Sequence, residues 1–250
     1  MTAESRQTAS RIRRFILEPA QDFVAAFVRV LPQNAWLALA LLFLGFLVAW
    51  WIYVPAHELL HAYGCLAVGG SVERLEIDAI YGAGFLQHIF PFVTVGSEYA
   101  GQLTGFDTHG NDLIYLVTVF APFLLSIFIG VPLLRSLGRD GQASLLRSFL
   151  FGASIPVALA PFTNVIGDYY EMGSILVSRV ARLFDASFPL ERWRSDDLIL
   201  TGNQLLFGET GRFSDWVGVL SGTLVGIVLA FATYRMGRLV ADHLYRRRGS

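Results

Sequence analysis

The sequence predicts an all-α integral membrane protein with about four transmembrane helices and a small membrane-associated β-hairpin after the first. Of its 250 residues, 54% are hydrophobic, and the mean hydropathy of the chain is +0.52. Several apolar runs reach the roughly 20 residues needed to cross a bilayer. All 19 basic residues are arginines clustered near the ends of these runs, as the positive-inside bias and phosphate headgroups favour. No long charged run indicates nucleic acid as a partner.

Residues 1–34 are predicted to form an N-terminal arm. The apolar residues Ile16, Phe23 and Phe27 recur at near-helical spacing among arginine and acidic residues. Residues 12–30 are therefore predicted to form an amphipathic interfacial helix that lies on the membrane surface. A helix packed on the rest of the protein is an equally weighted alternative. The charged interruptions exclude a cleavable signal peptide.

The long apolar runs give the transmembrane spans. A break at residues 32–34 precedes the first span, whose helix is predicted to continue to about Val68 and to end at Gly69-Gly70. The last span is rich in small residues, including Gly222 and Gly226, which allow close helix packing. The four spans are predicted at residues 35–54, 113–134, 148–166 and 216–236.

Two less apolar segments connect the spans. Residues 71–111 show partial alternation of apolar and polar residues with several glycines, which favours short strands or a hairpin that dips toward the membrane. Residues 177–214 are predicted to form a polar linker with an amphipathic helix. Residues 215–250 then contain the last transmembrane helix and a basic tail.

The first span leads into the motif His57-Glu58-Leu59-Leu60-His61. On a helix, positions i and i+4 share a face, so His57 and His61 can present imidazole nitrogens to one metal ion. Glu58 follows the first of these ligands and is placed to act as general base on a metal-bound water. Ionisable residues in an apolar span are costly and usually have a functional reason. The motif therefore predicts a metal site.

A catalytic zinc usually has three protein ligands and one open position. Asp168 is the leading third candidate, because it ends a proline-interrupted apolar run where an unpaired carboxylate is costly. An ordinary interfacial carboxylate is the alternative. Cys65 is four residues after His61 and is another candidate, although a small buried residue is the favoured interpretation. His88 and His109 lie in the linker and are interpreted as surface histidines.

Three segments in this order resemble the site-2 protease family of intramembrane zinc metalloproteases. They are the HELLH motif at the end of the first span, residues 70–77 directly after it, and residues 161–176. In the family the second segment leads into a membrane-associated β-hairpin, and the third carries an aspartate that binds zinc. Asp168 corresponds to that aspartate, and the nearby Asn164 is the candidate to hold the substrate backbone or the oxyanion.

The resemblance implies an intramembrane metalloprotease core over residues 35–176. In this core His57, His61 and Asp168 hold Zn²⁺, and Glu58 transfers the proton of the attacking water. The implied substrate is a membrane protein or peptide in the lipid bilayer, whose helix unwinds locally and adds as a strand to the hairpin. The expected location is a bacterial inner membrane.

The chain also departs from the family pattern. Tyr169 follows Asp168 where the family has glycine, and no stretch between the spans is long enough for an inserted PDZ domain. These departures favour an alternative, a non-proteolytic metal-binding or structural membrane subunit with the same fold. A transporter is disfavoured because the spans carry few polar residues. Substrate selection would depend on the linker, the hairpin or a membrane-protein partner. Arginine counts and the resemblance predict opposite orientations, so orientation stays open.

Overall fold

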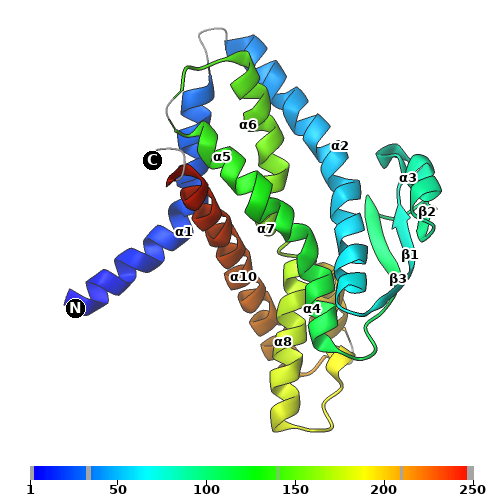
Figure 1. The fold of residues 1–250 in the computed structure, drawn as a ribbon. Helices are drawn as coiled ribbons and strands as arrows, with labels where there is room; N and C mark the ends of the chain where they lie inside the picture. The colour runs from blue at the N-terminus through cyan, green and yellow to red at the C-terminus, as the bar shows by residue number, and fades with distance from the viewer. Residues whose placement is uncertain (1–2, 32–34, 140, 209–210, 247–250) are drawn as a thin grey trace. The chain divides into compact units, whose positions relative to one another are not determined.

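The protein is described by a computed structural model in which the chain is mostly helical and carries one small sheet (Figure 1). The predicted break at residues 32–34 and the part of the basic tail beyond residue 246 lie outside the described residues. The structure describes residues 3–31, 35–139, 141–208 and 211–246.

The strands lie between residues 71 and 107, and helices form most of the chain before and after them. The helices are α1 (Ala3–Val30), α2 (Ala35–Ala67), α3 (Ala83–Ile89), α4 (Asp112–Phe120), α5 (Val131–Leu137), α6 (Leu145–Ala158), α7 (Ala160–Thr163), α8 (Asp168–Phe184), α9 (Leu198–Leu206) and α10 (Phe213–Arg246). The strands are β1 (Ser71–Ile77), β2 (Val93–Val95) and β3 (Gly101–Asp107). Short helical turns occupy Ala79–Tyr81, Ala121–Phe123, Ser126–Gly130 and Leu190–Arg192.

Three helical stretches are long and apolar enough to cross a membrane, as expected of an integral membrane protein. They are α2, the stretch Asp112–Leu137 and α10. The predicted third span, at residues 148–166, is not confirmed, because this segment is divided between α6, which has 14 residues, and the four-residue α7. Pro161 lies in the second of these pieces, and a proline ring disfavours helical geometry just before it.

The chain divides into two compact units, and each is described by itself. The first unit contains Met1–Trp51, Leu125–Ala160 and Phe231–Ser250. The second unit contains Ile52–Leu124 and Pro161–Ala230, and it therefore includes both the HELLH motif and Asp168.

In the first unit, α1 packs against α5 and α6. It is the predicted amphipathic helix, although it begins earlier, at Ala3. Ala26 and Val30 are fully buried on one side of this helix, whereas Val24 and Val28 are 56% and 69% exposed. The helix therefore packs on the protein through one face and leaves apolar side chains on another. An apolar face of this kind suits contact with lipid.

In the second unit, a three-stranded sheet follows α2 (Figure 1). The central strand, β1, pairs antiparallel with β3 and parallel with β2, so the segment is a mixed sheet rather than the simple hairpin predicted from sequence. Leu75 and Ile77 of β1 form a buried cluster with Ala62 of α2. These alternate residues of β1 share one face of the sheet. The cluster holds the sheet against the helix that carries the HELLH motif.

Glycines bring the helices of the second unit into close contact. A Cβ atom at Gly64 would lie 2.5 Å from the Ala121 Cβ atom, so α2 approaches the end of α4 closely. A Cβ atom at Gly173 of α8 would lie 2.0 Å from the carbonyl oxygen of Gly222 in α10. A Cβ atom at Gly226 would lie 2.5 Å from the carbonyl oxygen of Tyr169 in α8. The prediction that small residues of the last span permit close packing is confirmed.

Candidate metal centre

The two histidines of the motif lie side by side on α2 and face the same point. Both are buried, with 6% of His57 and 8% of His61 exposed. Their Nε2 atoms are 3.1 Å apart, and their rings are nearly perpendicular. This arrangement follows from the helical repeat, which places residues i and i+4 on one face.

Hydrogen bonds on the far side of each ring orient these Nε2 atoms. Nδ1 of His61 lies 2.9 Å from the carbonyl oxygen of Thr118. A carbonyl only accepts, so Nδ1 carries the proton and Nε2 of the neutral ring keeps a lone pair. Nδ1 of His57 lies 2.8 Å from the hydroxyl of Tyr53, whose oxygen can accept a hydrogen bond from Nδ1. Partners of this kind fix the tautomer and ring orientation of metal-binding histidines.

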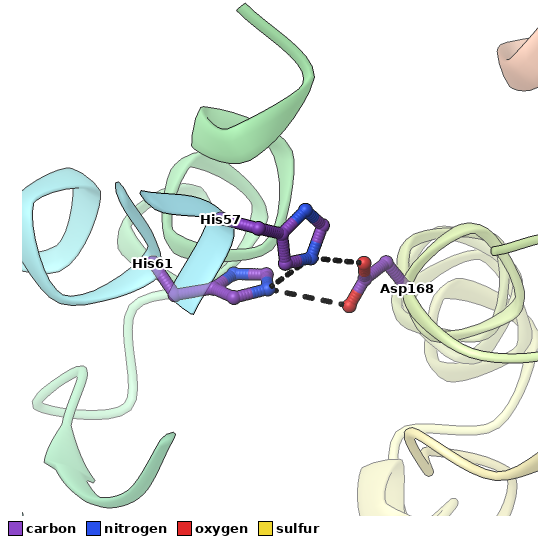
Figure 2. Close-up of side chains that lie close together, drawn as sticks. All are labelled: His57, His61 and Asp168. Carbon is purple, nitrogen blue, oxygen red and sulfur yellow. Dashed lines mark hydrogen bonds and ion pairs between the residues drawn. The ribbon is translucent and has the colours of Figure 1, made fainter. Parts of the chain in front are cut away.

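Asp168 brings the third group to this point from the first turn of α8. One of its oxygens lies 3.2 Å from Nε2 of His57, and the other lies 3.5 Å from Nε2 of His61 (Figure 2). The turn before α8 positions it, because the carbonyl oxygen of Asn164 accepts hydrogen bonds from the amides of Gly167 and Tyr169. A carboxylate is also favoured at this end of a helix by the helix dipole.

The donor atoms of this group lie close enough together to share one ion. With one ligand atom taken from each residue, these atoms all lie within 4.8 Å of one another. The two Nε2 atoms are 3.1 Å apart, and each lies near a different oxygen of Asp168. His57, His61 and Asp168 form a group that could hold a metal ion. A cation would also satisfy the two Nε2 lone pairs, which otherwise face each other.

Glu58 lies in the same cleft as this group. A cavity of about 500 Å³ is lined by Glu58 together with the three candidate ligands. The first residue of β3, Gly101, lies against it, because a Cβ atom there would be 2.5 Å from Glu58 Cγ. The strand therefore forms one wall of the cleft and limits where the Glu58 side chain can lie.

A further carboxyl group, which was not singled out from the sequence, also lines this cleft. Glu171 lies one turn after Asp168 on α8, and the hydroxyl of Tyr115 donates a hydrogen bond to it at 2.5 Å. Burial, reinforced by the nearby carboxylates of Asp168 and Asp196, raises the pKa of Glu171 to about 8. Its i+3 spacing from Asp168 was the available signal, since such residues share a helix face.

The segment after α8 closes another side of the cleft and is held by ion pairs. Arg192 donates two hydrogen bonds of 2.6 Å to the fully buried carboxylate of Asp215. Arg194 pairs with Asp112 at 2.9 Å. The side chain of Gln102 on β3 donates to Asp196 at 2.7 Å. Sequence reasoning treated this segment as a polar linker and missed these contacts.

The remaining candidates from the sequence lie elsewhere. The sulfur of Cys65 is 3.6 Å from the carbonyl oxygen of Ser71, and this residue is outside the group of three. His88 is in the last turn of α3, and His109 pairs with Asp107 at 3.0 Å on the surface. Asn164 lines the cleft, where its backbone oxygen organises the turn before Asp168.

Comparisons of the chain with family models, curated proteins and solved structures found no match. The function must therefore be inferred from the chemistry of this site. Two imidazoles and one carboxylate that could hold a metal ion share one cleft with the carboxylate of Glu58. Nitrogen and oxygen donors of this kind are found in hydrolytic zinc sites.

Proposed function

We propose that this protein is an intramembrane zinc metalloprotease, similar to the site-2 protease family, which hydrolyses a peptide bond in or near a transmembrane segment. The observation that carries the proposal is the convergence of His57 and His61 with Asp168, which is more than 100 residues away in the chain. Glu58 lines the same cleft and is not one of these three candidate ligands. A structural metal site needs no such extra carboxylate. The proposed location is the inner membrane of a bacterium.

Zinc is the proposed metal because it is commonly bound by histidine nitrogens together with a carboxylate oxygen. His57, His61 and Asp168 would hold it. When bound, zinc acidifies water and polarises the scissile carbonyl. The protein supplies the orientation of these ligands through the contacts of Tyr53 and the Thr118 carbonyl with the far side of each imidazole.

Glu58 is the proposed general base. It lies in the cleft beside the ligands, and the proposed mechanism has its carboxylate accept a proton from the attacking water. The same group would then deliver that proton to the nitrogen of the leaving amine. Asn164 lines the cleft and is the proposed partner of the substrate backbone or of the oxyanion.

The substrate is proposed to bind in an extended form along β3. This strand lies at one edge of the sheet, with the order β2-β1-β3, so its outer backbone groups have no partner strand within the sheet. Gly101, Gln102 and Phe106 of the strand also line the cleft. An unwound peptide can add to such an edge through backbone hydrogen bonds. A membrane helix must unwind before its peptide bonds become accessible.

Metal content provides the first test. The full chain, purified in detergent, should contain about one zinc per chain, and His57→Ala and Asp168→Ala should each lose it. Wild type without zinc, under conditions that preserve zinc in a control metalloprotein, would overturn the proposal. Unchanged zinc in Asp168→Ala would remove this residue from the ligand set.

Cleavage of a reconstituted single-span substrate provides the second test. Wild type should cleave it, and a chelator should stop the reaction. Zinc at full occupancy without cleavage of any member of a substrate panel would support the alternative, a non-proteolytic metal-binding subunit. Tyr169, which follows Asp168, is fully buried, and its ring centroid lies 4.4 Å from that of Phe123. This packing gives the tyrosine a role in the core, so its presence does not by itself favour the alternative.

A further inference from the structure

The first unit contains a second cavity, which is separate in sequence and in chemistry from the metal centre. It has a volume of about 580 Å³ and is lined by residues of α1 and by one residue of α10. Three arginines line it: Arg13 and Arg14 of α1 and Arg238 of α10. Ser10 and Gln21 add polar groups from α1.

Two acidic residues described near this cavity, Glu18 and Asp22, form ion pairs with arginines. Glu18, which is 4% exposed and also lines the cavity, pairs with Arg235 and with Arg238, the latter at 2.7 Å. Asp22 pairs with Arg238 at 3.2 Å and with Arg135 at 3.6 Å. Three arginines pair with these two carboxylates, and one of them, Arg135, also pairs with Asp242 at 2.7 Å.

The charge that remains belongs to Arg13 and Arg14. Both side chains are exposed, and neither forms an ion pair with another residue in the described part of the chain. The cavity therefore carries net positive charge on its accessible side. Two guanidinium groups with neighbouring hydroxyl and amide groups suit an anion such as phosphate, which arginine binds through paired hydrogen bonds.

The surroundings of the cavity are apolar. Leu17 lines it and is 37% exposed, and Ile16 beside it is 50% exposed. Further along the same helix, Val24 and Val28 also face outward. Exposed apolar side chains on an amphipathic helix are favourable when they contact acyl chains. A ligand with a phosphate group and an apolar tail would satisfy both parts of this surface.

We propose that this cavity binds the headgroup of an anionic phospholipid, with Arg13 and Arg14 on the phosphate and the acyl chains along the exposed face of α1. A net negative headgroup is favoured over a zwitterionic one, because the carboxylates nearby are already paired and the accessible charges are positive. The site does not depend on the proposed proteolysis, because it uses none of the residues of the metal centre.

Lipid binding to the full chain in detergent can be measured by native mass spectrometry with phosphatidylglycerol and, separately, with phosphatidylcholine. Wild type should bind phosphatidylglycerol more tightly. Two arginines at a charged headgroup together contribute a factor of roughly 30, so Arg13→Gln/Arg14→Gln should weaken this binding by about that factor. Arg13→Lys/Arg14→Lys keeps the charge and should retain most of it. Arg182→Gln/Arg212→Gln removes two exposed arginines from the second unit and should bind as wild type.

Three outcomes would overturn the proposal. Equal binding of the two lipids by wild type would show that charge does not select the headgroup. Unchanged binding in Arg13→Gln/Arg14→Gln, with the protein folded by circular dichroism, would place the lipid elsewhere. Tight binding of inorganic phosphate alone, lost in the same variant and competing with lipid, would assign the cavity to a free phosphate ligand.

Discussion

Gly101 stands directly against Glu58, because a Cβ atom at position 101 would lie 2.5 Å from Cγ of the glutamate. The sheet and the HELLH helix meet at this contact, so the backbone of β3 at Gly101 limits the position available to the proposed base. Gly101→Ala should shift Glu58 without changing the metal ligands. A misplacement of about 1 Å commonly lowers a rate on the order of 100-fold.

The expected result for Gly101→Ala is therefore a kcat about 100-fold lower with zinc content unchanged. Gly84→Ala is the matched control, because a Cβ atom there would meet no atom within 4 Å. Its activity should equal that of wild type. Full activity in Gly101→Ala would mean that this contact does not position the base.

Glu58→Gln tests the proton transfer itself. The amide keeps the size of the carboxylate and cannot accept the proton from water, so cleavage should fall by at least 100-fold. Zinc should stay bound, since Glu58 is outside the group of three candidate ligands. Metal analysis and a cleavage assay on the same preparation measure both quantities. Cleavage close to the wild-type rate would contradict the role of Glu58 as general base.

Tyr53→Phe tests the orientation of His57. The change removes the hydroxyl that lies 2.8 Å from Nδ1 and keeps the ring. Loss of such a partner typically lowers metal affinity 10- to 100-fold, which competition with a zinc chelator can measure. Tyr63→Phe, at a more exposed tyrosine on the same helix, is the control and should bind zinc as wild type. Equal affinities in the two variants would contradict an orienting role for Tyr53.

Much of the helical arrangement could be predicted from the sequence, because apolar length and helical period are local properties. The helix around His57 and His61 continues to Ala67, close to the predicted end at Val68. The grouping of these histidines with Asp168 could be inferred from the cost of a carboxylate at the end of an apolar run. The span predicted at residues 148–166 is not confirmed, because hydropathy measures apolar character and does not show that α6 ends at Ala158.

Other features depend on contacts between distant segments. The parallel pairing of β2 with β1 cannot be read from alternation, which indicates strands and not their partners. The same limit applies to Gly101 beside Glu58 and to the hydrogen bond from Tyr115 to Glu171. These last two contacts join residues more than 40 positions apart, and no local sequence pattern encodes them.

Arg192 and Asp215 provide a test of how the segment beside the cleft is held. Asp215 is fully buried, and it accepts hydrogen bonds from Arg192 at 2.6 Å and from the Trp193 indole at 3.1 Å. Arg192→Ala would leave this carboxylate buried without its cation, which typically costs about 3–5 kcal/mol. The melting temperature in detergent should fall by several degrees. Arg182→Ala, at an exposed arginine, should change stability by no more than about 0.5 kcal/mol. Equal melting temperatures for the two variants would mean that the buried pair does not stabilise this part of the protein.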